Sequence, residues 1–110
     1  MRKTAFALFG LFSLSATTAA AEVTCSGASG HLGRDAICSA ARAAFGNKST
    51  AITVDITNDE PNRLSARLSW SEGGKGQQGP RVDVTSADKP LDSRAVSRLI
   101  QGLQGSTDLP

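Results

Sequence analysis

The sequence of 110 residues contains no tyrosine, one histidine, one tryptophan and two cysteines. Without tyrosine, a lectin-like face that stacks sugar rings on exposed aromatic side chains is disfavoured. A structural zinc site takes four ligands, and His31 is the one histidine that could contribute. The two cysteines also lack the C-x-x-C spacing of redox pairs. We therefore expect no metal site and no cofactor.

The sequence also lacks an apolar run long enough to cross a membrane. Its longest apolar stretch, residues 5–14, is about half of the roughly 20 residues that a spanning helix needs. Arg2 and Lys3 precede this stretch, and small residues follow it up to Ala21. This order is typical of a cleaved secretory signal peptide.

We predict that residues 1–21 are the signal peptide and that residues 22–110 form one small domain. The product is expected to be periplasmic or secreted, with no stable membrane insertion after cleavage. Three residues separate Cys25 from the alanines, which argues against a lipid anchor. Cleavage removes two of the 12 basic residues and leaves ten against ten acidic ones, so the net charge becomes zero.

Both cysteines lie in the predicted mature chain. An exported protein with two cysteines most simply forms one disulfide, here between Cys25 and Cys38. Closing so short a loop contributes about 3 kcal/mol to stability in the chain-entropy model. Such a bridge matters in a domain whose core is small.

Periodicity predicts two helices and three strands in the mature chain. Apolar residues recur with helical spacing over 34–45 and again from Leu91 to Leu103. Strict alternation over 51–57, 63–70 and 81–85 predicts strands with one buried and one solvated face. Residues 58–62 are expected to form a turn and residues 71–80 a loop, while Glu22–Cys25 could add a short strand.

These elements predict an α+β fold of two layers. We expect a three-stranded antiparallel meander with both helices on one face, in the order αβββα, and one disulfide. The edges of that sheet would be residues 51–57 and 81–85, and either could accept a strand from a partner or a second copy. The solvated face would carry polar residues with cross-strand Arg–Asp pairs.

This element order is similar to that of double-stranded-RNA-binding domains. The resemblance implies a histidine between the first two strands and a basic cluster at the start of the second helix. Here the corresponding loop, residues 58–62, carries two acids and no histidine. Because phosphate binding depends on excess positive charge and the mature chain is neutral, we expect no nucleic-acid partner.

A catalytic interpretation centres on His31 in the glycine-rich segment 26–33. His31 could act as a base beside Ser29 or Asp35, which would make the protein a small extracytoplasmic hydrolase. The glycines in this segment and in 73–76 do not match the dinucleotide or phosphate-loop spacings. We therefore assign no catalytic residue.

Five side chains form the candidate binding surface: Arg63, Arg67, Arg81, Lys75 and Trp70. The arginines alternate along predicted strands, whereas Lys75 lies in the 71–80 loop. The sequence thus predicts a non-catalytic binding or accessory protein that acts on another envelope or secreted protein. Self-association through a sheet edge, including a homodimer, is the other non-catalytic interpretation.

Overall fold

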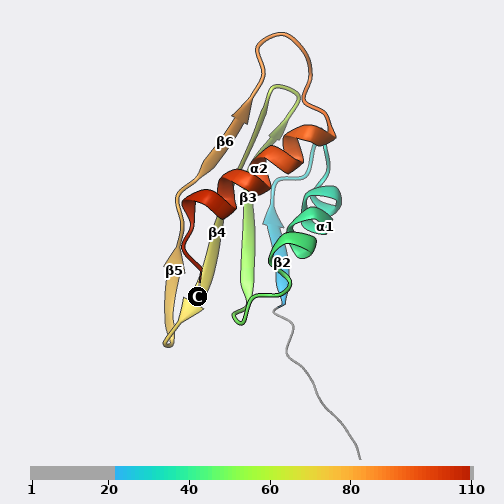
Figure 1. Cartoon of the computed structure of the whole chain (residues 1–110). Helices are drawn as coiled ribbons and strands as arrows, with labels where there is room; N and C mark the ends of the chain where they lie inside the picture. Colours follow the sequence, from blue (N-terminus) through green and yellow to red (C-terminus); the bar gives the residue numbers. More distant parts are fainter. Residues whose placement is uncertain (1–21, 110) are drawn as a thin grey trace, which may run out of the picture.

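The computed structural model describes residues 22–109, and the predicted signal peptide, residues 1–21, lies outside them. Within this range the chain forms five strands and two helices (Figure 1). In chain order they are β2 (Val23–Gly27), α1 (Arg34–Phe45), β3 (Ile52–Glu60), β4 (Arg63–Glu72), β5 (Lys75–Gln78), β6 (Val82–Thr85) and α2 (Ser93–Ser106). The α+β class and both helices are confirmed.

The sheet is mixed, so the predicted antiparallel meander and the order αβββα are wrong. β2 pairs in parallel with β3, because α1 crosses between them and returns the chain to the same end of the sheet. β3 and β4 form an antiparallel hairpin, and β4 then pairs with β5 along one half and β6 along the other. Residues 51–57 are therefore not an edge, since β2 covers that side of β3.

Both helices pack against the same face of the sheet (Figure 1). α1 presents Ile37, Ala41 and Phe45 to this face, and all three are buried. The rest of the predicted stripe is also buried: Leu91 lies just before α2, and the helix itself presents Ala95, Val96, Leu99, Ile100 and Leu103. The core thus lies between one sheet face and two helices, and no helix among residues 22–109 covers the other sheet face.

A bulge in β3 reverses the side-chain alternation that the sequence suggests. The pairing with β4 skips one residue between Ile56 and Asn58. Because successive side chains of a strand point to opposite faces, the extra residue turns Asp59 toward the helix side. Strand pairing also continues to Glu60, so the predicted turn over 58–62 shrinks to Pro61 and Asn62.

The predicted loop over 71–80 is instead largely a β-hairpin. β4 extends to Glu72, and β5 begins at Lys75. Gly73 and Gly74 connect the two strands with φ values of 60° and 81°. A two-residue hairpin turn of this kind needs positive φ at both positions, which glycine adopts without steric cost.

Gly102 marks the closest approach of α2 to the sheet. A Cβ atom at this position would lie 2.7 Å from Cγ1 of Val82. Alanine would add about 1 kcal/mol of helix propensity, but the overlap with a stiff β-branched side chain costs about 1–3 kcal/mol. We expect Gly102→Ala to lower the free energy of unfolding by about 1 kcal/mol, as measured by urea denaturation.

Gly105 provides the matched control in the same helix. Apart from the adjacent helix backbone, no atom of the described residues lies within 4 Å of the corresponding Cβ position. Gly105→Ala should therefore raise the free energy of unfolding by about 0.5 kcal/mol. Equal effects of the two substitutions on the free energy of unfolding would contradict the close α2–β6 contact. Val82→Ala should partly restore the stability that Gly102→Ala loses.

Candidate functional site

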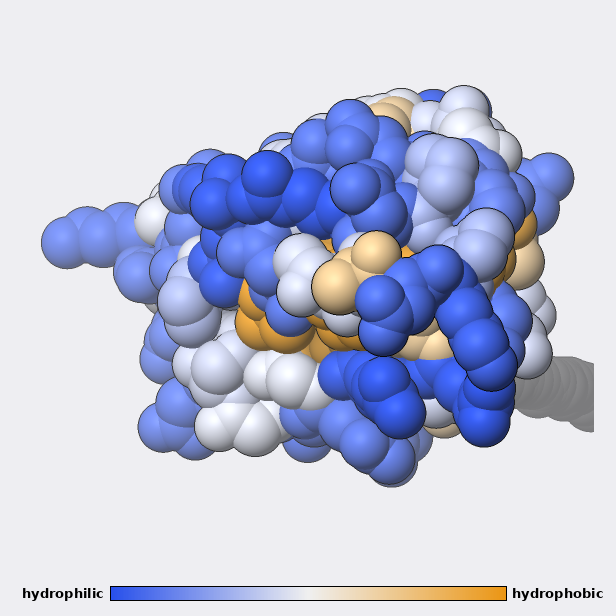
Figure 2. Space-filling model, turned by 90° about the horizontal axis from the view of Figure 1, so that it is seen from above, coloured by the Kyte–Doolittle hydropathy of each residue, from blue (hydrophilic) through white to orange (hydrophobic). Residues whose placement is uncertain are grey.

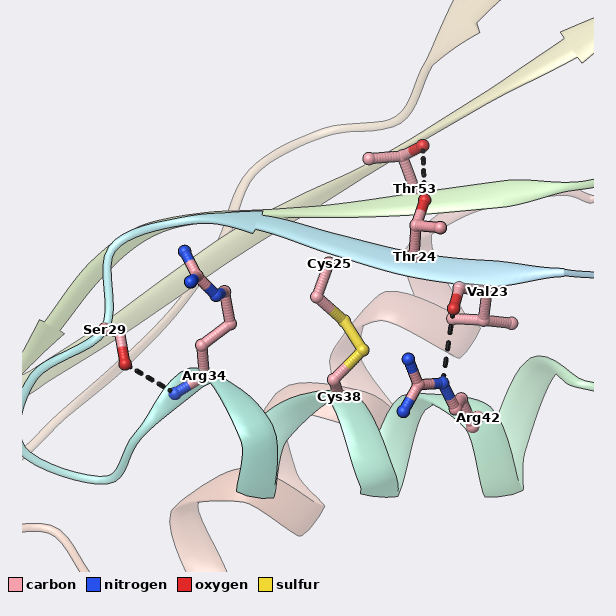
Figure 3. Close-up of a disulfide and its surroundings, with 8 residues drawn as sticks. All are labelled: Val23, Thr24, Cys25, Ser29, Arg34, Cys38, Arg42 and Thr53. Atoms are coloured by element: carbon pink, nitrogen blue, oxygen red, sulfur yellow. Dashed lines mark hydrogen bonds between the residues drawn. A yellow bond between two sulfur atoms is a disulfide. The ribbon is translucent and has the colours of Figure 1, made fainter.

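The predicted disulfide is present and joins the first strand to the first helix. Cys25 of β2 and Cys38 of α1 are bonded, with Cα atoms 5.8 Å apart. Figure 3 shows the bridge spanning from the strand to the facing side of the helix. Cys38 is 5% exposed, so the bond lies against the core.

Two arginines of α1 flank the disulfide and bind the outer backbone of β2. Arg34 Nη1 donates to the Gly27 carbonyl at 2.9 Å, and Arg42 Nε donates to the Val23 carbonyl at 3.3 Å (Figure 3 shows the second bond). Arg34, Cys38 and Arg42 recur every four residues, so they share one face of the helix.

These contacts close one edge of the sheet. Residues 22 and 28 direct their ladder hydrogen bonds toward β3. Because neighbouring residues of a strand alternate, the carbonyls of residues 23, 25 and 27 point away from β3. The two arginines bind two of these three carbonyls, and the disulfide crosses beside the third. Helix α1 therefore blocks part of the β2 edge, which hinders strand addition there.

The glycine-rich segment 26–33 is organised around an internal carboxylate, Asp59. Its Oδ2 accepts hydrogen bonds from Gly30 N–H and Gly33 N–H, each at 2.7 Å, and its Oδ1 accepts one from Leu32 N–H at 2.8 Å. A concave run of backbone N–H groups is a common anion-binding arrangement. Here the anion is part of the chain, so these N–H groups are occupied.

The surroundings of Asp59 change its acidity. Burial of the carboxyl raises its pKa, but the three backbone N–H groups and the nearby His31 outweigh this effect. The pKa of Asp59 therefore lies below its ordinary value of 3.8. The β3 bulge makes this contact possible, since it turns Asp59 to the side of the sheet where the segment 26–33 lies.

His31, Ser29 and Asp35 do not form a linked set. His31 Nε2 donates to the Leu91 carbonyl at 2.8 Å, which ties the glycine-rich segment to the start of α2. The Ser29 hydroxyl accepts from Arg34 N–H at 3.0 Å (Figure 3). Among residues 22–109, no hydrogen bond joins any two of the three side chains proposed for catalysis.

The three arginines of the candidate binding surface share the helix-free face of the sheet. Asp83 lies among them: its Oδ1 is 3.4 Å from Arg63 Nη2 and its Oδ2 is 3.5 Å from Arg81 Nε. Arg67 Nη1 donates to Gln78 Oε1 at 3.3 Å. Cross-strand polar pairing thus occupies each arginine.

Asp83 is held ionised by its neighbours. The hydrogen bond from the Ser65 hydroxyl is the main cause that lowers the pKa of Asp83, and the charges of Arg81 and Arg63 lower it further. Ser65 has no exposed surface, although it lies on the open face. Among the described residues, Arg63 and Arg81 are therefore paired with Asp83, whereas Arg67 binds the uncharged Gln78 side chain.

The strand register places Trp70 and Lys75 on the other face from the three arginines. Trp70 continues the inward alternation of β4 and is half-buried against the core. Lys75 is exposed and opposes Glu72 beside the hairpin turn. The five predicted side chains are thus divided between the two faces of the sheet.

The second edge of the sheet, formed by β5 and β6, has no covering element in the part of the chain that is described. Ser86 N–H donates to the Asn62 carbonyl at 3.0 Å, so residues 82, 84 and 86 direct their backbone groups toward β4. The N–H and C=O groups of Arg81, Asp83 and Thr85 consequently point away from the sheet. No described residue is hydrogen-bonded to these groups.

Residues 22–109 contain neither a metal-ligand cluster nor a membrane-spanning helix. No three side chains among His, Cys, Asp and Glu in this range lie closely enough together to hold a metal ion. No helix of the same range has the length and apolar character needed to span a membrane. Comparisons of the chain with family models, curated proteins and solved structures found no match.

Sequence reasoning missed the arginines that bind the β2 edge and the carboxylate that holds the glycine-rich segment. The i, i+4, i+8 spacing of Arg34, Cys38 and Arg42 was a usable signal, because it predicts one helix face directed at the Cys25 strand. Asp59 offered no such signal, since regular alternation places it on the solvated face.

Proposed function

We propose that this chain is an exported, non-catalytic binding or accessory module that acts on another cell-envelope or secreted protein. The leader-like residues 1–21 and the disulfide support export, because disulfides persist in oxidising compartments. In this proposal the β5–β6 edge binds an extended segment of the partner by adding it as a further strand.

The difference between the two sheet edges is the observation that carries this proposal. Helix α1 covers the β2 edge with two arginine hydrogen bonds and a disulfide. The β6 edge leaves three residues with outward backbone groups. Unpaired edges invite strand addition, so a protein that closes one edge and leaves the other open has one suitable docking position.

The side chains of β6 also suit strand addition. Val82 and Val84 point toward the helix side and are half-buried next to α2. An added strand would place alternate side chains beside this apolar strip. Asp83, the charged residue on the other face, is already paired with Arg63 and Arg81.

Thr85→Pro tests the edge directly. Thr85 N–H points outward, so proline removes a donor that a partner strand needs and leaves the ladder with β4 intact. We expect Thr85→Pro to lose at least about tenfold in partner binding, whereas Thr85→Ala, which keeps the N–H, binds normally. Binding is measured by capturing partners from envelope extract on the immobilised protein.

The comparison needs a check on folding and on self-association. Thermal unfolding of Thr85→Pro should lie close to that of the native protein, because Thr85 is exposed. Size-exclusion chromatography over a range of concentrations identifies a second copy as the occupant of the edge. Equal capture by Thr85→Pro and Thr85→Ala would contradict the proposal, as would the absence of any captured protein.

A further inference from the structure

A cationic pocket lies at the end of the open β6 edge. Thr85, the last residue of β6, lines this pocket together with the following loop and the first two turns of α2. Its volume is about 220 Å³, enough for one or two small side chains. Figure 2 views this end of the molecule and shows hydrophilic side chains around a hollow with a hydrophobic floor.

Three cations and one carboxylate line the pocket: Lys89, Arg94, Arg98 and Asp92. Asp92 is occupied by Arg94, since its Oδ2 lies 2.9 Å from Arg94 Nη2 and its Oδ1 accepts the Arg94 backbone N–H at 2.9 Å. Lys89 and Arg98 form no ion pair with any residue between positions 22 and 109. The pocket therefore carries a positive charge that the described chain does not neutralise.

The floor of the pocket is apolar. Leu91 and Ala95 are 8% and 3% exposed and line it from the start of α2. Most of the remaining lining is polar or charged, so a bound anion would meet the cations at a solvent-accessible site. Asp88, the other acid of this loop, does not line the pocket.

We propose that the strand bound at the β6 edge is an acidic segment whose Asp or Glu side chains enter this pocket and pair with Lys89 and Arg98. This inference rests on the proposed function, because the edge positions the segment. Thr85 belongs to both features: its N–H points outward at the β6 edge, and the same residue lines the pocket. Lys89 and Arg98 can each pair with a carboxylate. A segment with two acidic side chains therefore fits the pocket better than the single carboxylate of a chain terminus.

Selection from a random octapeptide library on the purified, disulfide-bonded protein tests the inference without requiring the partner itself. We expect the enriched peptides to combine alternating apolar residues with a cluster of Asp or Glu toward one end. Their affinity, measured by fluorescence anisotropy, should fall steeply as salt is raised, because the pairs are near the surface.

Charge reversal locates the acidic contact. Lys89→Glu/Arg98→Glu should weaken the enriched peptides at least about tenfold. As a matched pair of single variants, Arg98→Glu should weaken the peptides at least about fivefold, whereas Lys48→Glu should leave affinity within about twofold. Lys48→Glu makes the same change in net charge just before β3, at the other end of the sheet from Thr85. Thr85→Pro should abolish binding of the same peptides.

The outcomes separate the two proposals. Two results would overturn the acidic contact: enriched peptides without acidic residues, or equal losses of affinity in Arg98→Glu and Lys48→Glu. Thr85→Pro would still test the edge in either case. Failure to enrich any peptide, or full binding by Thr85→Pro, would overturn the edge proposal and the acidic contact with it.

Discussion

Replacing Asp59 by alanine is expected to lower the free energy of unfolding by about 3 kcal/mol. The substitution removes the acceptor of three backbone N–H groups in a site where Asp59 itself is 6% exposed. Hydrogen bonds to a charged acceptor contribute about 1.5–3 kcal/mol each, and part of this is regained when water reaches the exposed Gly30 N–H. Urea denaturation at neutral pH measures the loss.

Asp59→Asn should also change how stability depends on pH. The pKa of Asp59 is lowered in the folded protein, so the unfolded state binds the proton more tightly. Its contribution to stability is therefore complete above the unfolded pKa of about 3.8 and is lost as pH falls through the lower folded pKa. The native protein should lose more stability than Asp59→Asn as pH falls below 4.

Asp88→Asn is the matched control for this comparison. Asp88 is exposed in the loop after β6 and accepts no hydrogen bond within residues 22–109. Its substitution should change stability by less than about 0.5 kcal/mol. If Asp59→Asn and Asp88→Asn followed the same pH profile, the carboxylate would not be the group that holds segment 26–33.

Loss of the Cys25–Cys38 bond is expected to produce an effect of similar size. Cys25→Ala/Cys38→Ala should lower the free energy of unfolding by about 3 kcal/mol, because the unfolded chain regains the entropy of a closed loop. The two residues are separated by 13 positions. For a domain of this size, the midpoint of thermal unfolding should fall by roughly 10–20 °C.

Reduction of the native protein tests the same contribution without substitution. Dithiothreitol should lower the thermal midpoint of the native protein toward that of the double-alanine variant and leave the variant itself unchanged. A native protein whose midpoint does not respond to complete reduction, verified by thiol titration, would show that the two arginines alone hold α1 on β2.

The closed β2 edge gives this bond a second consequence. The disulfide lies between two arginine contacts on the same helix face, so its loss loosens the cover over outward carbonyls. Reduced protein should therefore form concentration-dependent oligomers more readily than oxidised protein. Light scattering of the two forms at equal concentration measures this.

Local patterns in the sequence predicted most of the secondary structure. Helical spacing placed α1 at residues 34–45, and Asp92 caps α2 as its position before the apolar stripe suggests. The short strand expected from Glu22 is present as Val23–Gly27. The disulfide followed from cysteine count and the leader-like N-terminus.

The errors arose where pairing between distant segments decided the outcome. β2 pairs with the outer side of β3 and becomes the edge strand itself. This makes β3, which was predicted to be an edge, an internal strand. The bulge in β3 depends on how this strand pairs with both β2 and β4, and no residue in the predicted turn indicates it. Residues 71–80 were expected to form a loop, and the strand pairing of β4 with β5 on either side of Gly73 and Gly74 was not predicted.

The candidate binding surface shows the same division. Alternation along β4 correctly placed Arg63 and Arg67 on one face with each other. The cross-strand Arg–Asp pairing expected on this face is present between Arg63 and Asp83, but alternation did not identify Asp83, 20 positions along the chain, as the partner. Charges that appear free in a sequence can thus be paired in the fold.

The sequence by itself determined the two helices, four of the five strands in outline, the apolar core side chains and the cysteine pair, but neither β5 nor the buried Asp59. These properties depend on period, composition and neighbours within a few residues along the chain. The tertiary structure alone decided which strand lies at an edge, which carboxylate holds the glycine-rich segment, and which cations remain unpaired. Each of these depends on contacts between segments that are far apart in the sequence, and such contacts leave little trace in local pattern.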